Sequence, residues 1–162
     1  MSSFKDYLPA PPPNLPIPRF MLKKKEPAAP LVQHGHCEYG ISCIKDHMGR
    51  AHLYINEAIR FSSSGEITPD ARQKIRQSRA ELQCEDDFSA AMEAPAEIRA
   101  EVLKLLAACR STWKAMDHCG IDTSSGTVDD LNELQVAIKT LWDTSYKIEE
   151  IYKSLKLEVK DG

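Results

Sequence analysis

An alternation of three- and four-residue steps runs through the C-terminal part of this sequence without a break. The residues at these steps are mostly apolar: Leu131, Leu134, Ile138, Leu141, Ser145, Ile148, Tyr152, Leu155 and Val159. Such spacing places side chains on one stripe of an α-helix, whereas a half-buried strand needs alternation at every second residue. The pattern therefore predicts a helix over about 128–157 with coiled-coil-like packing. Thr127, with Asp130 three residues later, resembles a capping box at its start.

Two further segments show the same period. A helix over about 38–63 is predicted from a seam made of Ile41, Ile44, Met48, Ala51, Ile55 and Ala58. A helix over about 96–119 is predicted from a seam made of Ile98, Val102, Leu105, Cys109, Thr112 and Met116. Gly65 follows the first segment and Gly120 follows the second, and glycine is the usual residue just after a helix end.

A helix between these two begins at Thr68, a good N-cap, with Pro69 at the first helical position. Its predicted seam is Ala71, Ile75, Ser78, Leu82, Glu85, Ser89 and Met92. Pro95 disfavours helical backbone at the preceding residue, which predicts a break near 93–95. Glu85 is a poor core residue because a buried unpaired carboxylate is costly. Either Glu85 is paired or bound to a metal there, or the helix rotates or breaks and leaves it solvated.

Four helices joined by short connections predict an all-α protein, specifically an up-down four-helix bundle over residues 37–162. The long last helix is compatible with oligomerisation. Residues 1–36 are predicted to form an extended, proline-rich N-terminal arm, because most of the prolines lie in residues 8–30 and proline fixes φ and lacks an N–H donor.

The arm also carries apolar residues that a plain spacer rarely needs: Leu15, Ile17, Phe20 and Met21. We expect these side chains to bind a partner, since a stiff segment docks into a groove at low entropic cost. The alternatives are a disordered tail or an arm folded back on its own bundle.

Charge and composition narrow the classes of partner. Residues 1–33 carry a formal charge of +3 and the rest carries −6, out of a total of −3. An acidic body is poorly suited to a nucleic-acid backbone, and the chain has no apolar run long enough to span a membrane. We also expect no signal peptide, because prolines and Lys23, Lys24 and Lys25 interrupt the N-terminal apolar residues. Five cysteines, an odd number, favour a reducing cytoplasm over a disulfide framework.

One group of residues has the chemistry of metal ligands. Cys43 and His47 are four residues apart and so share a helix face. Cys84, on the neighbouring predicted helix, is expected at a similar distance along the bundle axis. The predicted metal site comprises His36, Cys37, Cys43, His47, Cys84 and Glu85, with Glu81 as another neighbour and zinc or iron as the metal. The alternative is that these are structural thiols and surface histidines, because no cysteine pair has zinc-ribbon spacing and no HExxH occurs.

The sequence favours a non-catalytic function. It contains neither a Gly-rich phosphate loop nor a G-x-S-x-G nucleophile elbow. We therefore expect a helical accessory or interaction subunit, which docks on a larger partner or on another copy through its arm. The alternative is a metal-binding or redox protein, such as the small subunit of a metalloenzyme, that uses the Cys, His and Glu cluster.

Overall fold

The computed structural model describes residues 8, 35–62, 65–123 and 126–161, with side chains placed as far as residue 156. The helices are α2 (Gly35–Phe61), α3 (Pro69–Glu81), α4 (Glu85–Ala91), α5 (Ala96–His118) and α6 (Val128–Asp161). No strand occurs in this part of the chain, so the prediction of an all-α protein is confirmed. The residues predicted to bind a partner, Leu15, Ile17, Phe20 and Met21, lie outside the described residues.

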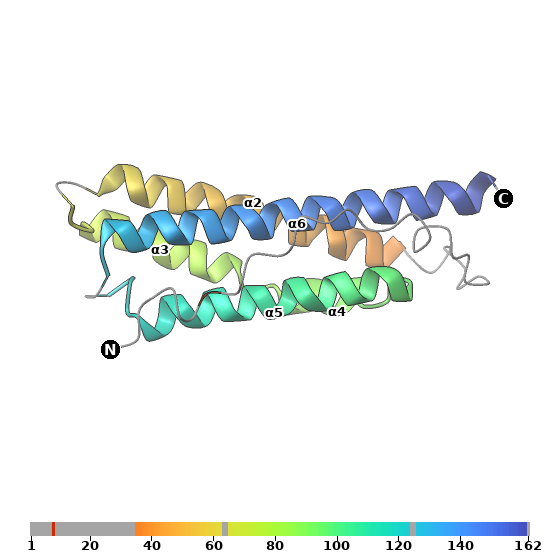
Figure 1. Ribbon diagram of the computed structural model, residues 1–162, viewed down its shortest axis with the longest axis horizontal. Helices are drawn as coiled ribbons and strands as arrows, with labels where there is room; N and C mark the ends of the chain where they lie inside the picture. Colours follow the sequence, from red (N-terminus) through yellow and green to blue (C-terminus); the bar gives the residue numbers. More distant parts are fainter. Residues whose placement is uncertain (1–7, 9–34, 63–64, 124–125, 162) are drawn as a thin grey trace.

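Helix α2 is the centre of the packing. It contacts α3 and α4 on one side and α6 on the other, and α6 runs beside it in Figure 1. Helix α5 packs on α6 and more weakly on α4, and the thiol of Cys109 reaches Met48 of α2 at 3.6 Å. Every residue of the predicted seams over 41–58 and 98–116 is buried, as are those of the last seam from Leu131 to Tyr152. Three-four periodicity thus located the core face of these helices correctly.

The seam of the second helix was predicted wrongly beyond Leu82. The helix breaks at residues 82–84, where the N–H groups of Leu82 and Gln83 bond to carbonyls three residues back and α3 ends in a tight turn. After the break the buried side chains include Cys84, Phe88 and Ala91, each one residue earlier than the predicted seam. Glu85 and Ser89 are therefore exposed rather than on the core face.

The helix caps predicted at Thr68, Thr127 and Gly120 agree with the structure. The Ala71 N–H donates to the Thr68 hydroxyl at 3.2 Å, which makes Thr68 the N-cap of α3. Thr127 and Asp130 form the expected capping box before α6, with the Thr127 N–H 2.9 Å from the Asp130 carboxylate. Gly120 has a φ of +59°, a backbone conformation that favours glycine after a helix end.

Three arginines of α3 hold the turn that follows α5. Arg72 donates to the carbonyl of Ile121 at 2.8 Å, and Arg76 donates to the carbonyl of Asp122 at 2.8 Å. Arg79 forms an ion pair with the Asp122 carboxylate at 2.8 Å, and the Asp122 side chain is only 3% exposed. These contacts fix the turn before α6 and give a buried carboxylate its counter-charge.

Close approach of α2 and α6 depends on Gly49. A Cβ at this position would lie 3.2 Å from the Trp142 indole nitrogen, so a side chain here would push the ring outward by a few tenths of an ångström. The imidazole of His52 and the phenol ring of Tyr146 lie 5.3 and 5.8 Å from the same indole, centroid to centroid. None of the described helices has the length and apolar character needed to cross a membrane.

Candidate functional site

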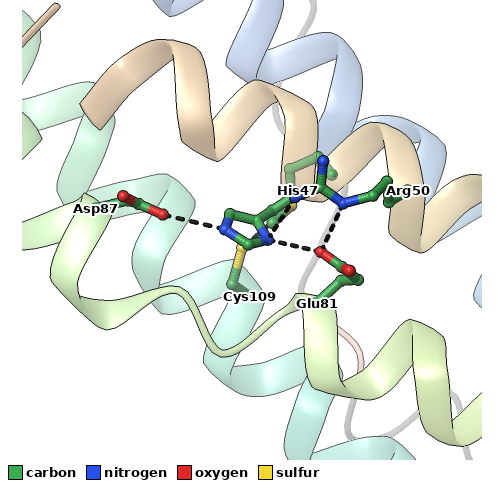
Figure 2. Close-up of polar contacts among 6 residues, drawn as sticks. His47, Arg50, Glu81, Asp87 and Cys109 are labelled. Atoms are coloured by element: carbon green, nitrogen blue, oxygen red, sulfur yellow. Dashed lines mark hydrogen bonds and ion pairs between the residues drawn. The ribbon is translucent and has the colours of Figure 1, made fainter. Parts of the chain in front are cut away.

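The most concentrated polar cluster around the predicted site residues is centred on His47 of α2 (Figure 2). Its Nδ1 lies 2.6 Å from a carboxylate oxygen of Glu81, and its Nε2 lies 3.1 Å from a carboxylate oxygen of Asp87. Arg50, one turn later on α2, donates from Nε to the same Glu81 oxygen at 3.1 Å. The cluster is partly buried: the side chains of His47, Glu81 and Asp87 are 28%, 19% and 24% exposed.

Local structure brings these groups together. Glu81 is the last residue of α3 and Asp87 belongs to the first turn of α4, so the two carboxylates lie on opposite sides of the helix break. Gly40 allows α4 to pack closely on α2, because a Cβ there would lie 2.8 Å from both the Ala90 Cβ and the Asp87 carbonyl oxygen. The break turns Asp87 towards His47, and the close helix packing brings it within reach.

The protonation of His47 decides how many of these contacts are hydrogen bonds. A protonated imidazole has an N–H on each nitrogen and can donate to both carboxylates at once, whereas a neutral ring donates to only one. A hydrogen on Nδ1 lets the ring donate to the Glu81 oxygen 2.6 Å away, whereas a bare Nδ1 can accept from Arg50 at 3.2 Å. With both contacts made, His47 links α2 to α3 and to α4.

The predicted metal ligands do not converge on one point. His36 is exposed in the first turn of α2, and Cys37 is buried, with its thiol directed to the Ala91 carbonyl at 3.9 Å. Cys84 is buried at the start of α4, while the exposed Glu85 pairs with Arg110 of α5 at 2.9 Å. His47 contacts its carboxylates through opposite edges of the ring, which cannot face a single ion.

The part of the chain that the structure describes contains no group of three or more His, Cys, Asp or Glu side chains suited to hold a metal ion. Burial, which disfavours the thiolate, raises the pKa of Cys37 to about 11 and that of Cys84 to about 12. The zinc or iron site thus gains no support from the arrangement and stays a prediction.

The burial of the thiols predicts their order of alkylation. In the folded protein we expect Cys43 to react with iodoacetamide first, then Cys119, whose pKa is also raised by burial and by Asp130. Cys37 should react at least about 100-fold more slowly than Cys43, because its raised pKa leaves little of the reactive thiolate. Timed mass spectrometry at pH 8 measures this order, with urea-unfolded protein as the control. Equal rates for Cys37 and Cys43 in the folded protein would contradict the assignment.

Asp87 is the partner of His47 that sequence reasoning missed. A helix continuous through Glu85 would not direct Asp87 to His47. Glu81 was expected near the cluster, and it is there. A signal for this position was present in the sequence. Cys84, Phe88 and Ala91 have the three-four spacing of a helix seam, just as the predicted seam through Glu85 and Ser89 does. A seam in this alternative register could have placed Asp87 beside α2.

A separate polar cavity of about 230 Å³ lies between α2 and α6. Its charged side chains form ion pairs: Lys45 and Lys153 contact one oxygen of Glu149 at 2.9 and 3.2 Å, and Glu38 pairs with Lys156 at 2.8 Å. Burial disfavours the ionised form of Glu149, but the hydrogen bonds from both lysines outweigh it and lower the pKa of this carboxyl group. The cavity is therefore bordered by an ion-pair network that ties α2 to α6.

Comparison with known proteins identifies no relative. No family model, no curated protein and no solved structure matches the chain. Function must therefore be argued from the residues themselves.

Proposed function

We propose that the chain is a non-catalytic, cytoplasmic interaction subunit: an up-down helical bundle with a proline-rich arm that docks on a larger partner or on another copy. The observation that carries this proposal is that an imidazole and several thiol groups of the described residues are engaged in contacts between helices. His47 is engaged by Glu81 and Asp87, and the thiols of Cys37, Cys84 and Cys109 are buried. In all of these contacts the reactive groups support the packing of helices.

The pKa values of the thiols support the same proposal. Nucleophilic cysteines need a lowered pKa and access to solvent. Burial instead raises the pKa of Cys37 and Cys84, and it raises that of Cys109 well above the usual thiol range. These thiols therefore have the properties of small apolar side chains in a core.

The docking role of the arm rests on its composition, and it is tested by changing only its apolar residues. We expect replacement of Leu15, Ile17, Phe20 and Met21 by serine to release the protein from its native assembly, as deletion of residues 1–33 should. The size of the assembly in extracts of the source cells, measured by native gel filtration with detection of the chain, gives the result. Circular dichroism should show unchanged helicity.

The matched control is Asn14→Ser, a polar replacement in the same segment, which should leave the assembly intact. Retention of both arm variants in an assembly of the native size would refute docking through the arm. Elution of the unmodified protein as a free monomer in the extract would do the same.

A further inference from the structure

The large apolar side chains that remain exposed in the described residues are unevenly distributed. Tyr39, Leu53 and Phe61 lie on α2 and Val136 and Tyr146 lie on α6, whereas only Leu103 lies on α5. At about 100° per residue, the three on α2 fall within one stripe about 80° wide, opposite the core face. The stripe lies away from the core face of α2, although Arg50 and Glu57 in the same angular range form ion pairs with Glu81 and Lys74 of α3. Exposed apolar residues that gather on one face indicate a contact surface.

The same stripe carries two charges in a symmetric arrangement. Asp46, Leu53 and Arg60 are spaced by seven residues, which is about two helical turns and places them in line. All three are exposed, and Leu53 is 52% exposed. Neither Asp46 nor Arg60 forms an ion pair within the described part of the chain. Leu53 therefore lies between a negative charge at one end of this line and a positive charge at the other.

Such a stripe is complementary to itself when two copies pack antiparallel. A two-fold axis through Leu53 places Leu53 against the partner's Leu53. It also places Asp46 opposite the partner's Arg60, and Arg60 opposite the partner's Asp46. This is an isologous contact, in which one patch meets its own copy. A parallel pairing would instead bring like charges together, so the charges select the antiparallel orientation.

Helix α6 extends the surface. A two-fold axis that crosses α2 brings the α6 helices of the two copies to the same side of the α2 pair. Gln135 bonds to Asn56, and Lys45 lies 4.9 Å from the Tyr146 ring, so the segment of α6 that carries the exposed Val136 and Tyr146 runs beside α2 at the level of Leu53. Stable interfaces bury about 1,200–2,000 Å² in total, so the contribution of α6 is needed beside a single helix pair.

We propose that the chain forms a two-fold symmetric, antiparallel dimer through the outer face of α2 and α6, with Leu53 on the axis and reciprocal Asp46–Arg60 ion pairs. The occupant of this face is a second copy of the chain, and the contact does not involve the arm.

Sedimentation equilibrium of the full chain and of two matched variants tests the apolar centre. Leu53→Asp should give a monomer. Leu103→Asp places the same charge at a side chain that is 51% exposed on α5, and it should remain dimeric. Circular dichroism checks that both variants fold. A wild-type chain that is monomeric at about 100 μM would overturn the proposal, as would equal loss of the dimer in both variants.

A charge swap tests the orientation. Asp46→Arg alone and Arg60→Asp alone should each weaken dimerisation by about tenfold at low salt, because each brings like charges together. The double variant Asp46→Arg/Arg60→Asp restores opposite charges across the axis and should dimerise within about threefold of the wild type. Additive weakening in the double variant would rule out this antiparallel register.

Deletion of residues 1–33 separates this proposal from docking through the arm. The deleted protein should remain a dimer even if it is lost from a larger assembly. A deleted protein that becomes a monomer would show that the arm, rather than the α2 and α6 face, joins the copies.

Discussion

Replacing Arg79 by methionine should lower the free energy of unfolding by about 3 kcal/mol, because it leaves the carboxylate of Asp122 buried without its counter-charge. Asp122 is 3% exposed at its side chain, and Arg79 approaches it to 2.8 Å. The other charged contact of Arg79, with Asp117 at 3.6 Å, is more exposed and contributes little. Urea unfolding of the wild type and the variant measures the difference.

Two controls separate the lost ion pair from lost packing. Arg76→Met removes an exposed arginine that, among the described residues, donates to the Asp122 carbonyl and to Gln73, and it should cost about 1 kcal/mol. The double variant Arg79→Met/Asp122→Asn removes both charges and should recover part of the loss. A loss of stability in Arg79→Met no greater than in Arg76→Met would show that the buried pair does not stabilise the turn.

Replacing Phe88 by alanine should cost about 3–5 kcal/mol, since Phe88 is a fully buried aromatic side chain on α4 and its removal leaves a cavity. Ser89→Ala, at the next residue, should change the stability by less than about 0.5 kcal/mol. Thermal or urea unfolding measures both. The pair tests the register of α4 directly, because a helix continuous with α3 would bury Ser89. Greater destabilisation by Ser89→Ala than by Phe88→Ala would mean that the break at residues 82–84 is wrong.

The sequence specified most of the fold because its helices have strict periods and clear ends. The seams of α2, α5 and α6 contain isoleucine, leucine and methionine at three-four spacing, and this pattern depends only on helix geometry. Several polar residues at seam positions are also buried as predicted, because backbone carbonyl groups accept hydrogen bonds from their hydroxyls. Ser78, for example, donates to the Ala51 carbonyl at 2.7 Å.

The break between α3 and α4 could not be predicted in the same way. Residues 82–84 contain neither glycine nor proline, so no local residue specifies the end of α3. The register of α4 depends instead on tertiary packing: Phe88 fills the core and Gly40 accepts the close approach of Ala90. A single sequence shows periodicity on each helix, but it does not show which of two equally spaced seams finds a partner.

The candidate site followed from the same information only in part. His47 and Glu81 were expected to lie together, and they do. Cys37 and Cys84 were grouped with them because thiol and imidazole share a preference for metals. Distance along a helix gives height but not the direction in which a side chain points, and these thiols are directed into the core.

The helix break also has a kinetic consequence. Because α3 and α4 do not share a continuous ladder of hydrogen bonds, the seven residues of α4 can open without unwinding the thirteen residues of α3. The side-chain contacts that hold α4 to its neighbours then set the free energy of this local opening, and His47 supplies one of them. Amide protons of α4 should accordingly exchange with solvent through sub-global fluctuations, ahead of those in the middle of α2, whose release requires global unfolding.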